Sequence, residues 1–454
     1  MLSALLSWTL AGPRAASAQV LPDAPAVDTL PNGLRVVTVR WPSPGIVSYY
    51  TLVQVGSGDE VEAGRTGFAH LFEHMMFRGT ERFPAADYEH RIQMMGADNN
   101  AFTSNDLTLY QVTAPAESLA EIVELEADRF QHLDYGEAAF QTETRAVLGE
   151  YQKSVASPSL PMWEALSEVA FTRHPYGHTT LGTLRDIQRM QSQYAYSRSF
   201  LHRYYTPDDC VIFAVGDVDR AAVLRLVTER YGAWSGRRDR PAIPEEPAQT
   251  EPRSRHLTWP SATSPRIFVG YRIPAFSTAN RDTAALRVLY ELAFGPSSDL
   301  YQRLVVQEQK VLSFGENGFD LQRAPGLLVV DAVLREGTTF DEITEAVTAE
   351  LSRIATGNVP EARIEEVESH VRYDLQLGLE TPDDVAVLLA RYTAMQGDVG
   401  ALDAFVARLG EVTAEDVARV AREMLTPAHR TVVTLAAAAP PPAAAPLPAT
   451  GGAR

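Results

Sequence analysis

The sequence is poor in three features that would each have pointed to a class of protein. It has one cysteine, Cys210, so an internal disulfide is excluded, and cysteine content does not separate the cytoplasm from an oxidising compartment. Its 40 Lys and Arg residues are outnumbered by 58 acidic ones, giving a net charge of -18, which argues against nucleic acid or an anionic membrane surface as a partner. The apolar N-terminal stretch, residues 2–12, is too short to span a bilayer.

The N-terminus nevertheless has features of an export signal. The apolar stretch is followed by Ala16-Ser17-Ala18 before Gln19, which is typical of a small-residue cleavage site and predicts a signal peptide over residues 1–18. No Lys or Arg precedes the apolar stretch, so a short disordered extension is the alternative. We therefore expect an exported protein, periplasmic or extracellular, and a cytoplasmic one if the segment is not a signal.

Hydrophobic patterning predicts two similar halves with a linker between them. At 454 residues and 45% hydrophobic, the chain can bury an ample core. Helical and strand-like stretches alternate over residues 27–234 and again over 256–435, the stretch 235–255 is a polar linker, and the Ala/Pro-rich tail 436–454 is predicted to be disordered. The clearest helices are expected at 119–130, 221–231, 282–293, 340–355 and 362–377, and the clearest strands at 34–39, 211–215, 266–271 and 326–333.

The most informative motif is His70-Leu71-Phe72-Glu73-His74. On a helix, positions 70, 73 and 74 share one face, so both imidazoles can reach one ion while Glu73 stands beside its open coordination site. Thr66-Gly67 offers a possible helix cap and Gly79 ends the run. The alternative is an accidental spacing of two ordinary helix residues, and a third ligand would decide between the two.

Two further carboxylates, Glu143 and Glu150, lie seven residues apart and therefore on one face of a helix. Glu150 could ligate a metal and Glu143 could support it, although carboxylates on a helix more often form a solvated face. Cys210 is better explained as a core residue than as a nucleophile, because it leads into an apolar strand-like run and no neighbouring histidine could activate it.

The order His-x-x-Glu-His is that of the inverzincins, and the chain resembles the pitrilysin/insulysin family of zinc peptidases, in particular its bacterial branch similar to the mitochondrial processing peptidase. The resemblance rests on GFAHLFEHMMFRGT (67–80), NNAFT (99–103), ETRAVLGE (143–150) and Gly216-Asp217. It implies an α+β fold in which two homologous α/β halves, each an antiparallel-rich sheet packed with helices, form a clam-like peptidase chamber.

Carried over by position, the resemblance implies one zinc ion bound by His70, His74 and Glu150, with Glu73 as general base and Glu143 orienting a ligand from the second shell. The implied activity is a zinc metalloendopeptidase that hydrolyses extended peptides with a zinc-activated water. The rival hypothesis is a non-catalytic binding or assembly subunit of the same fold.

The segment 99–103 resembles the family's edge strand, along which an extended substrate pairs through its backbone. Asn100 and Ala101 are then candidate substrate contacts; without the resemblance, Gly96 and Asp98-Asn99-Asn100 indicate only a turn before a strand.

If the halves are duplicates, Arg287, Tyr290 and Glu291 occupy the positions of His70, Glu73 and His74, so only the first half can carry this metal site. Many relatives have an Arg and a Tyr in the second half that hold the substrate carbonyl, but Val305 and Leu312 stand at those positions here. We therefore expect a heterodimer with a metal-free sister chain that supplies this donor, a homodimer being the alternative.

Overall fold

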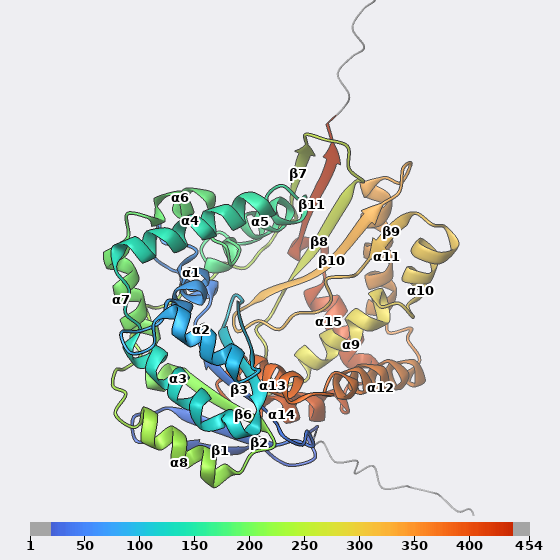
Figure 1. Ribbon diagram of the computed structural model, residues 1–454. Helices are drawn as coiled ribbons and strands as arrows, with labels where there is room; N and C mark the ends of the chain where they lie inside the picture. Colours follow the sequence, from blue (N-terminus) through green and yellow to red (C-terminus); the bar gives the residue numbers. More distant parts are fainter. Residues whose placement is uncertain (1–19, 439–454) are drawn as a thin grey trace, which may run out of the picture.

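A computed structural model describes residues 20–438, whose strands form two sheets, each packed with helices (Figure 1). The predicted signal, residues 1–18, lies outside the described residues. Within them, no helix combines the length and the apolar character needed to cross a membrane.

The first half of the chain builds a six-stranded sheet. Its strands are β1 (Ala26–Thr29), β2 (Arg35–Arg40), β3 (Ile46–Val53), β4 (Asp98–Thr103), β5 (Thr108–Pro115) and β6 (Cys210–Gly216). Its helices are α1 (Phe68–Met75), α2 (Ala85–Met94), α3 (Leu119–His132), α4 (Glu137–Ser154), α5 (Ser159–Ala170), α6 (Leu184–Met190), α7 (Tyr194–Tyr204) and α8 (Arg220–Tyr231). Short helical turns are η1 (Ser57–Asp59), η2 (Met76–Arg78), η3 (Ala116–Ser118), η4 (Pro175–Gly177) and η5 (Pro207–Asp209).

The second half builds a five-stranded sheet. Its strands are β7 (Arg253–Trp259), β8 (Arg266–Ile273), β9 (Val311–Phe314), β10 (Gly326–Leu334) and β11 (Arg430–Ala437). Its helices are α9 (Asp282–Phe294), α10 (Asp299–Tyr301), α11 (Phe340–Ala355), α12 (Glu361–Leu377), α13 (Pro382–Gln396), α14 (Ala401–Leu409) and α15 (Ala414–Met424), with the turns η6 (Gln302–Gln307) and η7 (Pro427–His429).

The two sheets have the same topology apart from β1. The first runs in the order β1-β2-β6-β3-β5-β4 and the second in the order β7-β11-β8-β10-β9. In each, the first strand of the shared order is parallel to its neighbour (β2 to β6, β7 to β11) and the remaining pairs are antiparallel. The strands β4 and β9 are therefore equivalent, as are β3 and β8, and both β4 and β9 are edge strands. The predicted α+β fold of two similar halves is confirmed.

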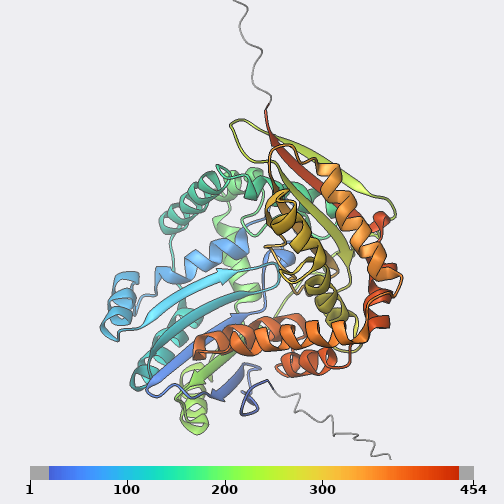
Figure 2. The same cartoon turned by 90° about the vertical axis from the view of Figure 1, so that its right-hand side faces the viewer.

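Each half covers the sheet of the other. Helix α13 of the second half packs on β3 and β6, and α5 of the first half packs on β7, β8 and β11 (Figures 1 and 2). Strand β6 is buried along its whole length because its side chains alternate between two cores. Ile212 faces the core of the first half, whereas Phe213 joins a core that continues into the second half. The boundary between the halves is therefore a packed interior.

Most predicted elements lie within two residues of the observed ones, and α11 has the predicted bounds. Two boundaries were wrong. The strand β7 begins at Arg253, inside the predicted linker, and β11 continues to Ala437, inside the predicted tail, because residues 253–259 pair in parallel with residues 431–437. Sequence composition alone does not reveal this pairing, since the polar linker and the Ala-rich tail each contribute only a few residues to it.

Candidate metal centre

Helix α1 carries three of the candidate site residues and begins at an unusual backbone position. Gly67 precedes it with φ of 89°, and a Cβ there would lie 2.6 Å from the carbonyl oxygen of Leu181. Glycine tolerates both the left-handed conformation and this close approach. The helix then buries Phe68, Leu71 and Phe72, which turns the polar face with His70, Glu73 and His74 away from the core.

The N-terminus of α1 is held by a carboxylate that sequence reasoning missed. Glu60 is buried and accepts hydrogen bonds from the backbone N–H groups of Gly67 and Ala69, each at 2.7 Å. Burial raises the pKa of Glu60 to about 8, although these backbone bonds act to lower it. Of the expected cap Thr66-Gly67, Gly67 does precede the helix as its N-cap residue, whereas the Thr66 hydroxyl donates to Asp186 at 2.8 Å. No local motif in the sequence marks a cap at Glu60, seven residues before Gly67.

The predicted third ligand lies next to the two histidines. Helix α4 packs against α1 and presents Glu143 and Glu150 toward it. Glu150 Oε2 lies 3.4 Å from His70 Nε2, and Glu150 Oε1 lies 3.5 Å from His74 Nε2. One ligand atom from each of the three side chains falls within 4.8 Å of the others, and within residues 20–438 this is the only such His/Cys/Asp/Glu group. Two imidazoles and a carboxylate are a donor set typical of catalytic zinc.

Glu143 is placed to orient His74. Its Oε2 atom lies 3.3 Å from His74 Nδ1, and its side chain is only 6% exposed. A carboxylate at Nδ1 favours the tautomer that leaves the Nε2 lone pair free for a metal, and such partners are usual behind histidine ligands. Arg78 forms an ion pair with the same carboxylate, which balances its charge in this buried position. The donor set and its support therefore fit a zinc ion.

The titration of the site agrees with a ligating and proton-accepting function. Burial, and then the charge of His74, lower the pKa of His70 to about 4, so its imidazole is neutral at pH 7. Burial raises the pKa of Glu73, opposed by a 2.7 Å hydrogen bond from the Thr103 hydroxyl to Glu73 Oε2. A carboxylate with a raised pKa is a stronger base, as proton abstraction requires.

Thr103 belongs to β4, which is an edge strand and contacts α1. Because only one side of β4 pairs with a neighbour, the other side has unpaired backbone groups. Asn100 is exposed and Ala101 is buried on this strand, and the Asn100 side-chain oxygen accepts from the Ala101 N–H at 2.9 Å. The edge position agrees with the prediction for residues 99–103, and their contact with a substrate stays a prediction.

The second-half positions singled out by sequence lie elsewhere. In α9, Arg287 donates to Glu291 at 2.7 Å and Tyr290 donates to the Gly315 carbonyl at 3.1 Å, so each of the three side chains has a hydrogen-bond partner. Leu312 is 51% exposed on β9, which lies on the opposite side of the molecule from α1 (Figure 1). Cys210 is fully buried at the start of β6, which confirms its assignment to the core.

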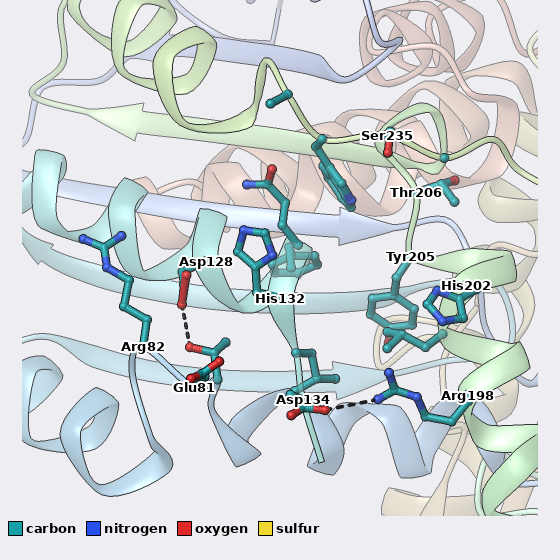
Figure 3. Close-up of a pocket in the computed structure, with 18 residues that line it drawn as sticks. Glu81, Arg82, Asp128, His132, Asp134, Arg198, His202, Tyr205, Thr206 and Ser235 are labelled. Atoms are coloured by element: carbon teal, nitrogen blue, oxygen red, sulfur yellow. Dashed lines mark hydrogen bonds and ion pairs between the residues drawn. The ribbon is translucent and has the colours of Figure 1, made fainter. Parts of the chain in front are cut away.

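A cavity of about 1220 Å³ lies away from this site. It lies between α3, α7 and residues 233–236, and Figure 3 shows Asp134 paired with Arg198 and Asp128 bonded to Thr80 on its wall. It contains none of the candidate site residues. Two smaller cavities lie between the halves beside the site: one of about 320 Å³ reaches His178 and Trp163, and one of about 410 Å³ reaches Phe102 and Thr103.

Comparisons with known proteins show which proteins this chain resembles. Residues 35–184 match the model of the insulinase family, described as peptidase family M16, and residues 193–369 match a model described as the peptidase M16 inactive domain. A zinc protease of Mycobacterium bovis is 30% identical over 89% of this chain and 91% of its own length. The zinc protease PqqE of Helicobacter pylori is 28% identical over 90% of this chain and 91% of its own length. Among solved structures, a protease from Helicobacter pylori superimposes with a TM-score of 0.84 at 27% identity, covering 91% of this chain and 99% of that one.

Proposed function

Because this chain belongs to the insulinase family of peptidases, family M16, we propose that it is a zinc metalloendopeptidase whose metal ligands are His70, His74 and Glu150. The observation that carries the proposal is the convergence of these three side chains from α1 and α4, with their ligand atoms within 4.8 Å of one another. The zinc-protease relatives support the identity of the metal.

Each residue has a distinct task in the proposed reaction. Bound zinc supplies a Lewis acid that polarises the scissile carbonyl and lowers the pKa of a water toward about 7. Glu73 takes the proton of the attacking water and passes it to the leaving amine, and Thr103 fixes the Glu73 carboxylate during both transfers. Glu143 holds His74 in its ligating tautomer.

The proposed substrate is an extended peptide segment that adds to the edge of the first sheet at β4. The unpaired side of this strand would supply backbone hydrogen bonds, with Asn100 and Ala101 in contact with the peptide. Because β4 also carries Thr103, a peptide paired there lies next to Glu73.

The decisive experiment compares the wild-type chain with Glu73→Gln and with a matched control, Glu89→Gln, on the exposed face of α2. We expect one zinc per chain in all three proteins. Cleavage of a quenched, unstructured peptide should fall by about 100-fold or more in Glu73→Gln, since a positioned general base contributes about 10² to 10⁴-fold. The control should cleave normally. Equal cleavage by Glu73→Gln, or absence of zinc from the wild-type chain, would refute the proposal.

A second chain is proposed as the source of the donor that holds the developing oxyanion. The positions that carry this donor in many relatives hold Val305 and Leu312 here, whose apolar side chains cannot donate a hydrogen bond, and β9, which carries Leu312, lies on the opposite side of the molecule from α1. A second copy of this chain would bring the same two apolar residues. A metal-free sister chain with an Arg and a Tyr at these positions therefore fits better than a homodimer. Loss of one preorganised donor costs about 3 kcal/mol, so activity of the chain alone should rise markedly when the sister chain is added.

The same experiment addresses the rival function. If the wild-type chain binds zinc but cuts no peptide, with or without the sister chain, the chain is better described as a binding or assembly subunit. Full activity of the chain alone would instead refute the proposed partner.

The export of the chain and its division into domains are also proposals. The chain is proposed to be exported by a signal over residues 1–18, which a mature N-terminus at Gln19 would support. Its metal-bearing domain is assigned to residues 27–234, and its metal-free domain is assigned to the part of the chain that begins with β7 at Arg253 and ends with β11 at Ala437. Because α5 and α13 are exchanged between the sheets, the two parts should not fold when expressed separately.

A further inference from the structure

In each half, a connection joins the edge strand to its neighbour: β4 to β5 in the first half and β9 to β10 in the second. These two connections differ in length, and they meet at the boundary between the halves. In the first half, β4 and β5 are joined by a turn at residues 104–107. In the second half, the connection between β9 and β10 spans residues 315–325. This longer loop crosses to the first half, where Arg323 bonds to Asp106 of the shorter turn and Ala324 bonds to Tyr176.

Arg323 binds the first half at three places. Its Nη2 donates to Asp59 Oδ2 at 2.9 Å, its backbone N–H donates to Asp106 Oδ2 at 3.0 Å, and its Nη1 approaches the Gln54 carbonyl at 3.5 Å. Its Nε also lies 3.6 Å from Asp106 Oδ1. Tyr176 completes the cluster, because its hydroxyl donates to Asp106 and accepts from the Ala324 N–H.

The cluster is buried, and a second arginine, Arg240, faces one of its carboxylates, with Nη1 at 3.5 Å from Asp59 Oδ1. The side chains of Asp59 and Asp106 are 2% and 3% exposed, and that of Arg323 is 19% exposed. Burial acts to lower the pKa of Arg323, but the charges of Asp59 and Asp106 outweigh it and raise that pKa. Burial raises the pKa of Asp106, and the charge of Arg323 offsets part of that rise. Buried charges in such a network fix the positions of the segments that bear them.

The two segments that Arg323 holds both lead to the metal centre. Asp106 lies in the turn that follows Thr103, the residue that binds Glu73. Asp59 ends η1 and precedes Glu60, which caps α1. The segments are also tied to each other, because the N–H groups of Ser57 and Gly58 donate to the carbonyls of Ser104 and Asn105 at 3.1 and 2.7 Å. The turn and η1 therefore form one unit.

We propose that Arg323 is a positioning residue: from the metal-free half it holds the unit of residues 56–60 and 103–107, and through Thr103 and Glu60 it fixes Glu73 and the start of α1. The catalytic part of this inference rests on the proposed function. In this inference the second half supports the metal centre of its own chain. This function is separate from any donor that a second half supplies to a partner chain.

A second arginine that crosses the boundary provides a matched control. Arg253 of β7 donates from Nη1 to the carbonyls of Val169 and Ala170 at 2.9 Å each. It therefore joins the second half to the end of α5, and within residues 20–438 it forms no hydrogen bond or ion pair with residues 56–60 or 103–107. Substitution of Arg253 tests whether any loss of a cross-half arginine has the same effect.

The test compares Arg323→Gln, Arg323→Lys and Arg253→Gln with the wild-type full-length chain by hydrogen exchange of the zinc-free proteins and by cleavage kinetics. We expect Arg323→Gln to speed amide exchange at least tenfold in peptides covering 56–75 and 98–107, with α8 unaffected. It should lower kcat at least tenfold with KM within about threefold and zinc still bound. Arg323→Lys should recover part of both effects, and Arg253→Gln should alter exchange only around α5.

Opposite results would overturn the inference. Unchanged exchange in both segments, or a kcat equal to that of wild type despite faster exchange, would reduce Arg323 to a purely structural contact. If Arg323→Gln does not fold, Asp106→Asn serves instead, because it weakens the Arg323 contact while an amide can still accept from Tyr176, and the same exchange pattern is required. If the wild-type chain cleaves nothing, the proposed function fails, and the exchange measurement still decides whether Arg323 positions the two segments.

Discussion

Helices α1 and α9 follow the equivalent strands β3 and β8, yet their polar residues are satisfied in different ways. In α9, Arg287 pairs with Glu291 one turn later, and Tyr290 bonds to the Gly315 carbonyl just beyond β9. In α1, the corresponding residues face a second helix, α4, and the Nδ1 atom of His70 is buried without a hydrogen-bond partner among the described residues.

The difference shows what separates a structural polar cluster from a binding site. In α9, Arg287 and Glu291 bond to each other and Tyr290 bonds to a backbone carbonyl, so all three side chains have partners within the second half. The α1 side chains and Glu150 approach at 3.4 and 3.5 Å, which brings lone pairs together without a hydrogen bond at the usual length. Ligand atoms that converge without forming hydrogen bonds to one another are arranged as a metal cation requires.

The largest effect should come from removing the ligand His70 of α1. Removal of Arg287, which stands at the equivalent position of α9, is the comparison. We expect His70→Ala to weaken zinc binding by more than about 100-fold, because one of three protein ligands is lost, whereas Arg287→Ala should bind zinc as wild type does. Competition with a chromophoric chelator measures both affinities. If both variants lost zinc equally, the loss would reflect general destabilisation rather than ligation.

The second-largest effect on zinc affinity is expected from substitution of Glu143, which contacts the ligand His74. Glu143→Gln removes the carboxylate at His74 Nδ1, so zinc affinity should fall by about 10 to 100-fold. Glu137→Gln changes an exposed carboxylate on the same helix and should leave the affinity within about twofold of wild type. The same chelator titration applies, and an unchanged affinity in Glu143→Gln would show that Glu143 does not orient His74.

The two helix N-termini differ in a way that pH can reveal. The first backbone N–H of α9, that of Asp282, donates to the exposed Asn280 side chain, whereas α1 begins on the buried carboxyl group of Glu60. Because burial raises the pKa of Glu60 to about 8, the folded state keeps a proton that the unfolded chain releases above about pH 4.5. This contribution to stability is complete below that pH and is lost as pH rises toward 8, by at most about 1.4 kcal/mol per pH unit.

Urea denaturation of the zinc-free protein between pH 5 and 8 measures this dependence. The free energy of unfolding of wild type should fall more steeply with rising pH than that of Glu60→Gln, which cannot titrate at this position. Parallel curves for the two proteins would mean that Glu60 is ionised throughout and caps α1 as a carboxylate.

The smallest effect is expected in α9. Tyr290→Phe removes one hydrogen bond, to Gly315, and should lower the free energy of unfolding by about 0.5 to 1.5 kcal/mol without changing zinc content or cleavage. Thermal denaturation and metal analysis measure the two quantities. A loss of zinc in this variant would show that the halves are coupled more tightly than their separate hydrogen bonds indicate.

Particular elements show how far sequence reasoning reached. Helix α11 was predicted at its observed bounds from its hydrophobic periodicity alone, and the structure adds a capping box of Thr339 and Glu342 at its start, so local hydrogen bonds and periodicity agree. The cap of α1 was assigned only in part, because the side chain that binds its N-terminus, Glu60, is brought to the helix by the preceding loop rather than by the spacing of a cap motif.

The sequence by itself determined which residues share a face. Residues 70, 73 and 74 and residues 143 and 150 are placed by the 3.6-residue period of the helix, which depends only on backbone hydrogen bonds within a few residues. Only the tertiary structure decided that these two faces meet, that β4 is left at an edge, that α5 and α13 are exchanged, and that Arg323 reaches Asp59 and Asp106. These outcomes depend on apolar faces finding partners hundreds of residues away, and the local pattern does not specify which partner each face will have.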